Sequence, residues 1–546
     1  MKTPWEEFIE KPVLKLNKDN FIQQIVEFGY FTEQFPACFS SKLFSAKLDE
    51  MLLFAPCTKT QVKYSSKNAN LPTTLSMRKD NISRRILSLP NPNAFLRLVK
   101  LMQENWYDIQ IYAESSFSLS PITYIHKYNN YGERAMLNSE NVRESFSSKS
   151  DFVKGIRNCI QAALGYRSRL KVDIANCYNS IYTHSIAWAI CGKDDAKKYL
   201  RTKEPESLKL RYELADKLDA FMRFQKNNET NGIVVGPFTS RIFSEIILAA
   251  IDKQLANKGY VFRRYVDDYK FYFKSEAEAK GSIPHIERLL NEYGLQLNIS
   301  KTEIDCFPFE IVSQMKDTYE EALSKDGVFG VLNVASLLYL NGEKGAYKYA
   351  LKFINNHEPS VDDLGVIISS LINILIIEPK YGKYIIQYLK KYFHKWDKKL
   401  IAELLNKELG ISINDELQQE ALVFLHIIKE LKLTLSGENL IDILCCSNDF
   451  AIIIALDIWH NKNKLVIRTK SQATAIKKGV ERLCFELKGE KYSGARWLLL
   501  YEIKFHKLID DSLCPTPLKD DFFDELYKNQ VTFYKSVYNG LRKLDT

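Results

Sequence analysis

The chain has 546 residues, 46% hydrophobic and 26% charged, a composition that excludes a disordered, collagen-like or coiled-coil protein and allows more than one domain. Its 76 lysines and arginines exceed its 67 aspartates and glutamates, and the net charge of +9 permits a polyanionic partner without requiring one. Its ten cysteines form no C-x-x-C pair, which argues against a zinc site or a disulfide framework and is typical of a cytoplasmic protein.

The two ends of the chain differ in composition. Twelve of the 16 prolines lie in residues 1–310, and only four lie in the rest. We therefore expect a mixed α+β domain over residues 1–310 and an α-helical domain over residues 311–546. The charged first 20 residues do not resemble a signal peptide, and the apolar run at 365–377 is too short to cross a bilayer, so no membrane association is expected.

The first chemically informative segment is basic. Six basic residues and one acid lie between positions 78 and 100, and the basic set is Arg78, Lys79, Arg84, Arg85, Arg97 and Lys100. Guanidinium groups pair well with phosphate oxygens, so this segment is a candidate phosphate-binding surface. The alternative is a solvated helix face, which is what a charge run more commonly forms.

Residues 170–174 form a short β-like run that places Asp173 at the end of a predicted strand. By itself Asp173 could be a strand-end cap, because aspartate readily binds neighbouring backbone groups. The stretch at 207–225 has helical spacing and ends at the polar sequence NNETNG.

The segment FRRYVDDYKFYF predicts a β-hairpin over residues 261–273, with Asp267 and Asp268 at its turn. An ordinary acidic surface turn is the alternative. With Asp173 on a neighbouring strand, however, three carboxylates could hold two Mg²⁺ ions, which prefer oxygen ligands and bind substrate phosphates. Two such ions can activate an attacking hydroxyl and stabilise a leaving pyrophosphate, so the pattern predicts nucleotidyl transfer.

The second half of the chain is rich in helical periodicity. Residues 364–376 carry apolar side chains at helical spacing, directly after the acidic pair Asp362 and Asp363, and Pro379 ends the pattern. Comparable segments follow at residues 385–393, 421–431, 440–444 and 496–508. They predict stacked helical hairpins, and because no repeat of fixed length is evident, we expect an irregular helical array.

Taken together, the motifs resemble the palm of reverse transcriptases. Asp173 matches the first catalytic motif, and YVDD matches the catalytic hairpin. The segment NGIVVGPFTSRIFSEI resembles the family's second motif, with Asn231 where the family commonly has glutamine, and GLQLNISKTE resembles the fourth. The fold implied is α+β, a right-hand polymerase with fingers and palm.

This resemblance assigns further residues to the nucleotide site. It implies that Gly232 lies in the loop that supports the nascent base pair and that Lys301 lies near the triphosphate. Arg84 and Arg85, with Arg78, are the triphosphate candidates of the fingers. Tyr178 stands where the family places an aromatic ring beneath the incoming sugar, which would exclude a 2′-hydroxyl and select dNTPs. A buried core tyrosine is the alternative for this position.

A narrower resemblance is to the bacterial abortive-infection reverse transcriptases of the AbiK type, carried by DIANCYNSIYTHSIAWAICGK, RYVDDYKFYF and NISKTEIDCFPF. It implies an all-α HEAT-like domain after the palm, a homo-oligomer, and a role in phage defence in the bacterial cytoplasm. It also implies template-independent synthesis of single-stranded DNA, primed by a protein hydroxyl and attached to it. Tyr30 is the candidate for that hydroxyl.

Two alternatives remain at this stage. The chain could be a conventional RNA-templated reverse transcriptase, such as a retron or intron enzyme. It could instead be a catalytically inactive scaffold that binds nucleic acid or protein, although three intact aspartates argue against a relic site.

Overall fold

The fold is taken from a computed structural model that describes residues 13–55, 69–79, 83–120, 122, 124–126, 152–309, 315–343, 345–461, 465–510, 512–513, 517 and 519–536. The expected domain boundary at residue 310 lies outside the described residues. Asp80, the single acid of the basic segment, also lies outside them.

A four-stranded antiparallel sheet occupies the first part of the chain, in the order β6 (Val261–Tyr265), β7 (Asp268–Phe273), β5 (Ser168–Asp173) and β8 (Glu303–Cys306). The predicted strand ending at Asp173 and the predicted hairpin are both confirmed. Alternate residues of β5 and β7, such as Leu170 and Phe271, are fully buried, because one face of the sheet packs against helices. The register places Asp173 opposite Asp268.

Helices on this part of the chain pack around α13 (Phe238–Asn257), which is buried along most of its length. The predicted helix at 207–225 is confirmed as α12 (Lys209–Phe224), preceded by a short 3₁₀ turn. The other helices here are α2 (Phe21–Gly29), α3 (Lys42–Ser45), α4 (Leu48–Leu52), α5 (Pro92–Glu104), α6 (Trp106–Ala113), α8 (Phe152–Ala162), α9 (Cys177–Ser180), α10 (Ser185–Cys191), α11 (Lys193–Thr202) and α14 (Glu276–Glu292). A small pair of strands, β1 (Val13–Lys15) and β4 (Tyr124–His126), completes it.

The basic segment forms a β-hairpin and not a helix. Strand β2 (Thr73–Arg78) pairs with β3 (Arg84–Leu89), and Arg78 lies opposite Arg84. Helix α5 begins directly afterwards, where the Asn91 side chain accepts hydrogen bonds from the backbone N–H groups of its first turn and Pro92 fits the first helical position. Neighbouring arginines on a strand point to opposite faces, so Arg84 and Arg85 cannot share one surface.

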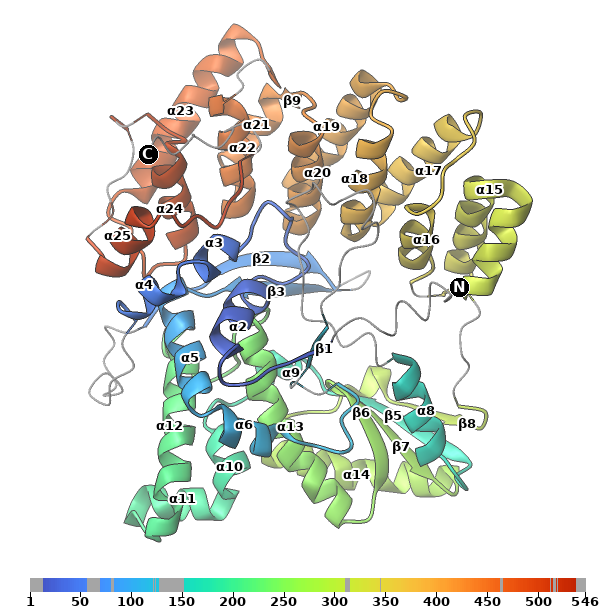
Figure 1. Ribbon diagram of the computed structural model, residues 1–546, viewed down its shortest axis with the longest axis vertical. Coiled ribbons are helices and arrows are strands. Elements are labelled where there is room, and N and C mark those ends of the chain that lie inside the picture. Colours follow the sequence, from blue (N-terminus) through green and yellow to red (C-terminus); the bar gives the residue numbers. More distant parts are fainter. Residues whose placement is uncertain are drawn as a thin grey trace.

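The second part of the chain is an array of antiparallel helices (Figure 1). The predicted helices are confirmed as α17 (Leu364–Ile377), α18 (Gly382–Lys391), α20 (Gln418–Glu430), α21 (Gly437–Ile443) and α24 (Trp497–His506). The others are α15 (Met315–Leu340), α16 (Ala346–Ile354), α19 (Lys398–Asn414), α22 (Asp449–Asn461), α23 (Lys470–Leu487) and α25 (Asp521–Lys528), with the two-residue strands β9 (Leu435–Ser436) and β10 (Val466–Ile467) between them. The spacing of apolar residues predicted these helices correctly because apolar side chains line their packed faces.

Helix α15 contains the stretch Asp317–Leu340, which among the described residues is long and apolar enough to span a membrane. Its backbone is interrupted at Asp326 and Gly327, where φ and ψ are not helical. A Cβ atom built on Gly330 would lie 2.8 Å from the carbonyl oxygen of Ala322, so the segment folds back on itself as a hairpin. This is not the backbone of a straight membrane-spanning helix.

The two parts of the chain share one hydrophobic core. Phe39 and Tyr534 form a β-bridge, the Ser40 N–H donates to the Phe533 carbonyl at 2.9 Å, and the buried residues form a continuous cluster from Leu16 to Tyr534. The β2–β3 hairpin lies between the helical array and the four-stranded sheet (Figure 1). The helical array and the first part of the chain therefore form a single folded unit.

Candidate active site

Three acidic residues lie at one end of the four-stranded sheet. Asp173 ends β5, Asp268 begins β7 directly opposite it, and Asp267 precedes Asp268 in the hairpin turn. Residues that lie opposite each other in an antiparallel pair project from the same face, so the Asp173 and Asp268 side chains are neighbours. Burial, followed by the charge of Asp267 and the contact with Asp173, raises the pKa of Asp268 to about 6. The carboxylates that the sequence singled out thus form one cluster of excess negative charge.

The Asp173 carboxylate is held by the segment that follows α14. Asn298 donates its backbone N–H to the Asp173 carbonyl and its Nδ2 to Asp173 Oδ2, both at 2.8 Å. Lys301 Nζ lies 3.3 Å from the same Oδ2 atom. The structure therefore places Lys301 beside the acids. It also identifies Asn298 as a residue that orients Asp173, a role that the sequence analysis missed although Asn298 lies in a segment singled out there.

The turn between β6 and β7 has a strained backbone. Val266 has a φ of 59°, a left-handed conformation that β-branched residues rarely adopt. Its carbonyl accepts a 2.9 Å hydrogen bond from the fully buried Arg264. Arg264 also forms 2.7 Å ion pairs with Glu245 and Asp252 of α13. A buried network of charged residues therefore holds the turn in place through Arg264. Sequence reasoning missed Arg264 because its neighbour is also arginine and only burial distinguishes them.

The glycine loop of the second motif lies along the segment that carries Tyr178. Ile233 N–H donates to the Tyr178 carbonyl, and Gly232 N–H donates to the Ile181 carbonyl, both at 2.8 Å. Gly232 has a φ of 75°, and a Cβ there would lie 2.8 Å from the Asn179 carbonyl oxygen. No residue larger than glycine fits this approach without moving the backbone.

Tyr178 packs at the edge of the core beside the acidic cluster. Its ring is partly buried against the core. Burial raises the pKa of its hydroxyl, and the charge of Arg241 on α13 opposes this rise. This placement suits a residue that contacts a substrate bound at the acids.

Arg241, on the first turn of α13, is a further cation at this site. Its Nη2 donates to the Ser120 carbonyl at 2.9 Å and lies 3.2 Å from Glu245. Its Nη1 is buried and has no hydrogen-bond partner among the described residues. Burial raises the pKa of Asp267, and Arg241 is one of the charges that oppose this rise. Sequence reasoning quoted Arg241 within the second motif but gave it no role.

The three arginines of the β2–β3 hairpin, here called the fingers hairpin, do not form one phosphate-binding surface. Burial raises the pKa of Asp267, and the charges of Arg241 and of the exposed Arg85 oppose this rise. Arg84 instead makes a bidentate ion pair with Glu420 of α20, and Arg78 donates to the Ile377 carbonyl at 3.2 Å. The assignment of Arg78 and Arg84 to the triphosphate is corrected here, because the alternation of the strands points Arg84 away from Arg85.

The assignment of Tyr30 as a priming residue is also corrected. Tyr30 is 1% exposed, and its hydroxyl donates to the Pro90 carbonyl at 2.5 Å. Its ring packs against Phe31, Phe95 and Phe533. A buried, hydrogen-bonded hydroxyl whose pKa is raised by burial is not available as a nucleophile.

The three acids offer oxygen ligands for a metal ion. Over the described ranges of the chain, no three His, Cys, Asp or Glu side chains converge closely enough to form a ready set of metal ligands. The donor chemistry nevertheless fits a hard divalent cation, because Asp173, Asp267 and Asp268 offer only oxygen ligands and two of them carry raised pKa values. Bound cations relieve the repulsion that such a cluster otherwise carries.

The family model for reverse transcriptase (RNA-dependent DNA polymerase) matches residues 78–368. The chain belongs to the reverse transcriptase family. The matched range begins at the last residue of β2, holds β3 and the four-stranded sheet with its three acids, and ends within α17. Asp173 and the YVDD hairpin lie within the matched range.

Among curated proteins, the retron Ec48 reverse transcriptase of Escherichia coli is 28% identical over 161 residues. That match covers 29% of this chain and 34% of the retron enzyme, so the chain spans about a third of the length of this relative. Among solved structures, the apo telomerase of Candida tropicalis matches with a TM-score of 0.29 and 14% identity over 67% of each chain. Telomerase of Candida albicans in complex with an RNA fragment matches with a TM-score of 0.25 and 12% identity, over 66% of this chain and 65% of that one.

Proposed function

We propose that this protein is a DNA polymerase that joins dNTPs to a growing strand by metal-assisted nucleotidyl transfer at Asp173, Asp267 and Asp268. The observation that carries the proposal is the placement of these three acids at one edge of the sheet of a reverse transcriptase chain, with Asp173 held by Asn298 and Lys301. A site that gathers acids at such a cost in repulsion is expected to have a use for them.

The surrounding residues fit defined roles in this reaction. Two Mg²⁺ ions at the acids would supply charge stabilisation for the attacking and leaving oxygens. Lys301, Arg241 and Arg85 surround the acids with positive charge suited to a triphosphate. Tyr178 would exclude a ribose 2′-hydroxyl, and Gly232 would keep the loop that supports the base pair close to Tyr178.

We further propose that the enzyme serves phage defence in the bacterial cytoplasm and makes single-stranded DNA without a template, primed by and attached to a protein hydroxyl, as a homo-oligomer. The support is the resemblance of its palm segments to abortive-infection reverse transcriptases. The antiparallel helix pairs of α15 to α25 support a HEAT-like array of the kind expected there. The burial of Tyr30 leaves the priming residue to be found.

A second candidate function is RNA-templated reverse transcription. The 28% identity with a retron reverse transcriptase favours it directly. A scaffold without catalytic activity is a weaker candidate, because all three acids are present and Asp173 contacts both Asn298 and Lys301.

The test is incorporation of labelled dNTPs by purified protein with Mg²⁺, resolved on a denaturing gel before and after protease treatment, with Asp267→Ala as control. Label that stays with the protein until digestion, without added nucleic acid, would support untemplated, protein-primed synthesis. Products that require an added RNA template and follow its sequence would establish the second candidate. Silence under both conditions would favour the scaffold.

A further inference from the structure

The fingers hairpin is fixed to the helical array by polar contacts from one helix. Gln418 Oε1 accepts the Ser76 N–H at 2.7 Å, and Gln419 Oε1 accepts the Arg78 N–H at 3.2 Å. Glu420 accepts two hydrogen bonds from the Arg84 guanidinium, at 2.8 and 3.1 Å. Three consecutive residues at the start of α20 therefore hold both strands of the hairpin.

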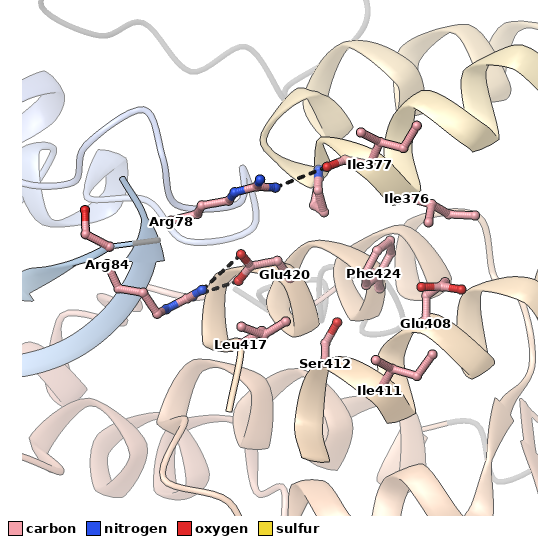
Figure 2. A pocket seen from close by; sticks show the side chains of 12 residues that line it. Arg78, Arg84, Ile376, Ile377, Glu408, Ile411, Ser412, Leu417, Glu420 and Phe424 are labelled. Carbon is pink, nitrogen blue, oxygen red and sulfur yellow. Dashed lines mark hydrogen bonds and ion pairs between the residues drawn. The ribbon is translucent and has the colours of Figure 1, made fainter. Parts of the chain in front are cut away.

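One face of the hairpin packs into the core, where Leu75, Leu87 and Leu89 are buried. The other face borders a cavity of about 330 Å³ beside the array, and Arg78, Arg84, Glu420 and Phe424 are among the residues that line it (Figure 2). The Arg84 and Glu420 side chains are only 27% and 9% exposed, so their bidentate pair is well shielded from water. A shielded bidentate pair of this kind fixes the position of the Arg84 end of the strand.

The other face of the hairpin turns toward the catalytic edge. Arg85 follows Arg84 on β3 and acts electrostatically on Asp267. Ser88 N–H donates to the Val235 carbonyl at 2.8 Å, which joins β3 to the glycine loop of the second motif. A Cβ on Gly236 would lie 3.3 Å from the Ser88 carbonyl, so the two segments approach closely. Movement of β3 would shift Arg85 and this loop together.

We infer that Glu420, with Gln418 and Gln419, positions Arg85 over the catalytic acids, so that the helical array forms part of the nucleotide site. Glu420 is a positioning residue: it acts through Arg84 and the backbone of β3 and does not touch the nucleotide. The inference rests on the proposed polymerase function. It predicts that the array controls dNTP affinity.

The test measures binding of a fluorescent dNTP to the full chain in Ca²⁺, together with KM and kcat for dNTP incorporation in Mg²⁺. Glu420→Gln and Arg84→Gln should each weaken dNTP binding and raise KM about 10-fold, with kcat changed less than 3-fold and with the melting temperature preserved. The double variant should be no worse than either single variant, because both remove one contact. Gln418→Ala is a milder variant that should act in the same direction.

Glu33→Gln is the matched control. It removes another ion pair between the two parts of the chain, Glu33 to Lys383 at 3.3 Å, which does not involve the residues of α20. Its dNTP binding should equal that of the wild type. Arg85→Gln should weaken binding more than Glu420→Gln does.

The possible outcomes separate the two proposals. Wild-type protein that neither binds nor incorporates dNTPs would overturn both. Wild-type binding that Arg85→Gln weakens and Glu420→Gln leaves unchanged would overturn the inference alone. Tighter binding by Glu420→Gln would also overturn it, because it would mean that Glu420 merely withholds Arg84 from the triphosphate.

Discussion

Asp173 and Asp268 lie directly opposite each other on adjacent antiparallel strands, so their acidic side chains project from the same face of the sheet. Burial and the neighbouring acids raise the pKa of Asp268 to about 6. At pH 7.5 the metal-free carboxyl group is therefore mostly ionised in surroundings that disfavour its charge, and a bound cation would relieve this.

Replacing Asp268 with Asn should stabilise the metal-free protein at pH 7.5. The folded pKa of about 6 lies above the ordinary value of 3.8, so the wild type loses stability as pH rises from about 4 through 6, and the variant lacks this loss. Because the side chain is partly exposed, we expect a modest increase in melting temperature, about 1–2 °C, in EDTA. Thermal unfolding between pH 4 and 8 measures it.

Mg²⁺ should make the wild type more stable than Asp268→Asn. It should raise the melting temperature of the wild type and leave that of Asp268→Asn nearly unchanged, because the variant lacks one charged ligand. Asp362→Asn, at an exposed position of the helical array, is the control for loss of a carboxylate elsewhere. An equal response of Asp268→Asn and the wild type to Mg²⁺ would contradict the metal assignment.

Asn298→Ala should lower kcat about 10- to 100-fold, the usual effect of removing a residue that orients a metal ligand. The Asp173 carboxylate would lose its 2.8 Å hydrogen bond from Nδ2. Asn298→Asp should be worse, because it removes the donor and adds a like charge beside Asp173. Steady-state incorporation across a Mg²⁺ titration measures both, and unchanged activity in Asn298→Ala would show that Asp173 needs no such support.

The sequence was sufficient to predict the elements that carry the acids. The strand ending at Asp173 and the hairpin at 261–273 have strong local patterns, apolar and aromatic arms bounded by an acidic turn. Helices such as α17 were equally evident because their apolar spacing reports a packed face. The spacing of apolar residues along the chain therefore predicted the individual strands and helices correctly.

Contacts between residues far apart in the sequence could not be predicted in this way. Arg84 and Arg85 are adjacent and chemically identical, and only the strand pairing and a partner 336 residues away, Glu420, distinguish their roles. Tyr30 lies in an unremarkable sequence, and its burial depends on Phe533 at the other end of the chain. Such differences arise from tertiary packing, which no single segment records.

Arg264→Met should destabilise the protein by about 3–5 kcal/mol, because it leaves Glu245 and Asp252 buried without their cation. It should also release the Val266 carbonyl and so lower activity in the fraction that still folds. Urea denaturation followed by circular dichroism measures the free energy of unfolding. Arg263→Met, the neighbouring residue on the other face of β6, should cost less than 1 kcal/mol. Similar losses in both variants would refute the role given to the buried network.

Tyr178→Ala should reduce discrimination between dNTPs and rNTPs by roughly 10- to 100-fold, since the ring leaves a space where a 2′-hydroxyl can be accommodated. The change should come from faster rNTP incorporation, while dNTP incorporation falls only slightly. Tyr178→Phe separates the two parts of the side chain: it loses the hydroxyl but retains the ring, so it should keep the preference for dNTPs. The ratio of kcat/KM for the two sugars is the measurement, and a ratio unchanged in Tyr178→Ala would mean that the ring serves only the packing around α13.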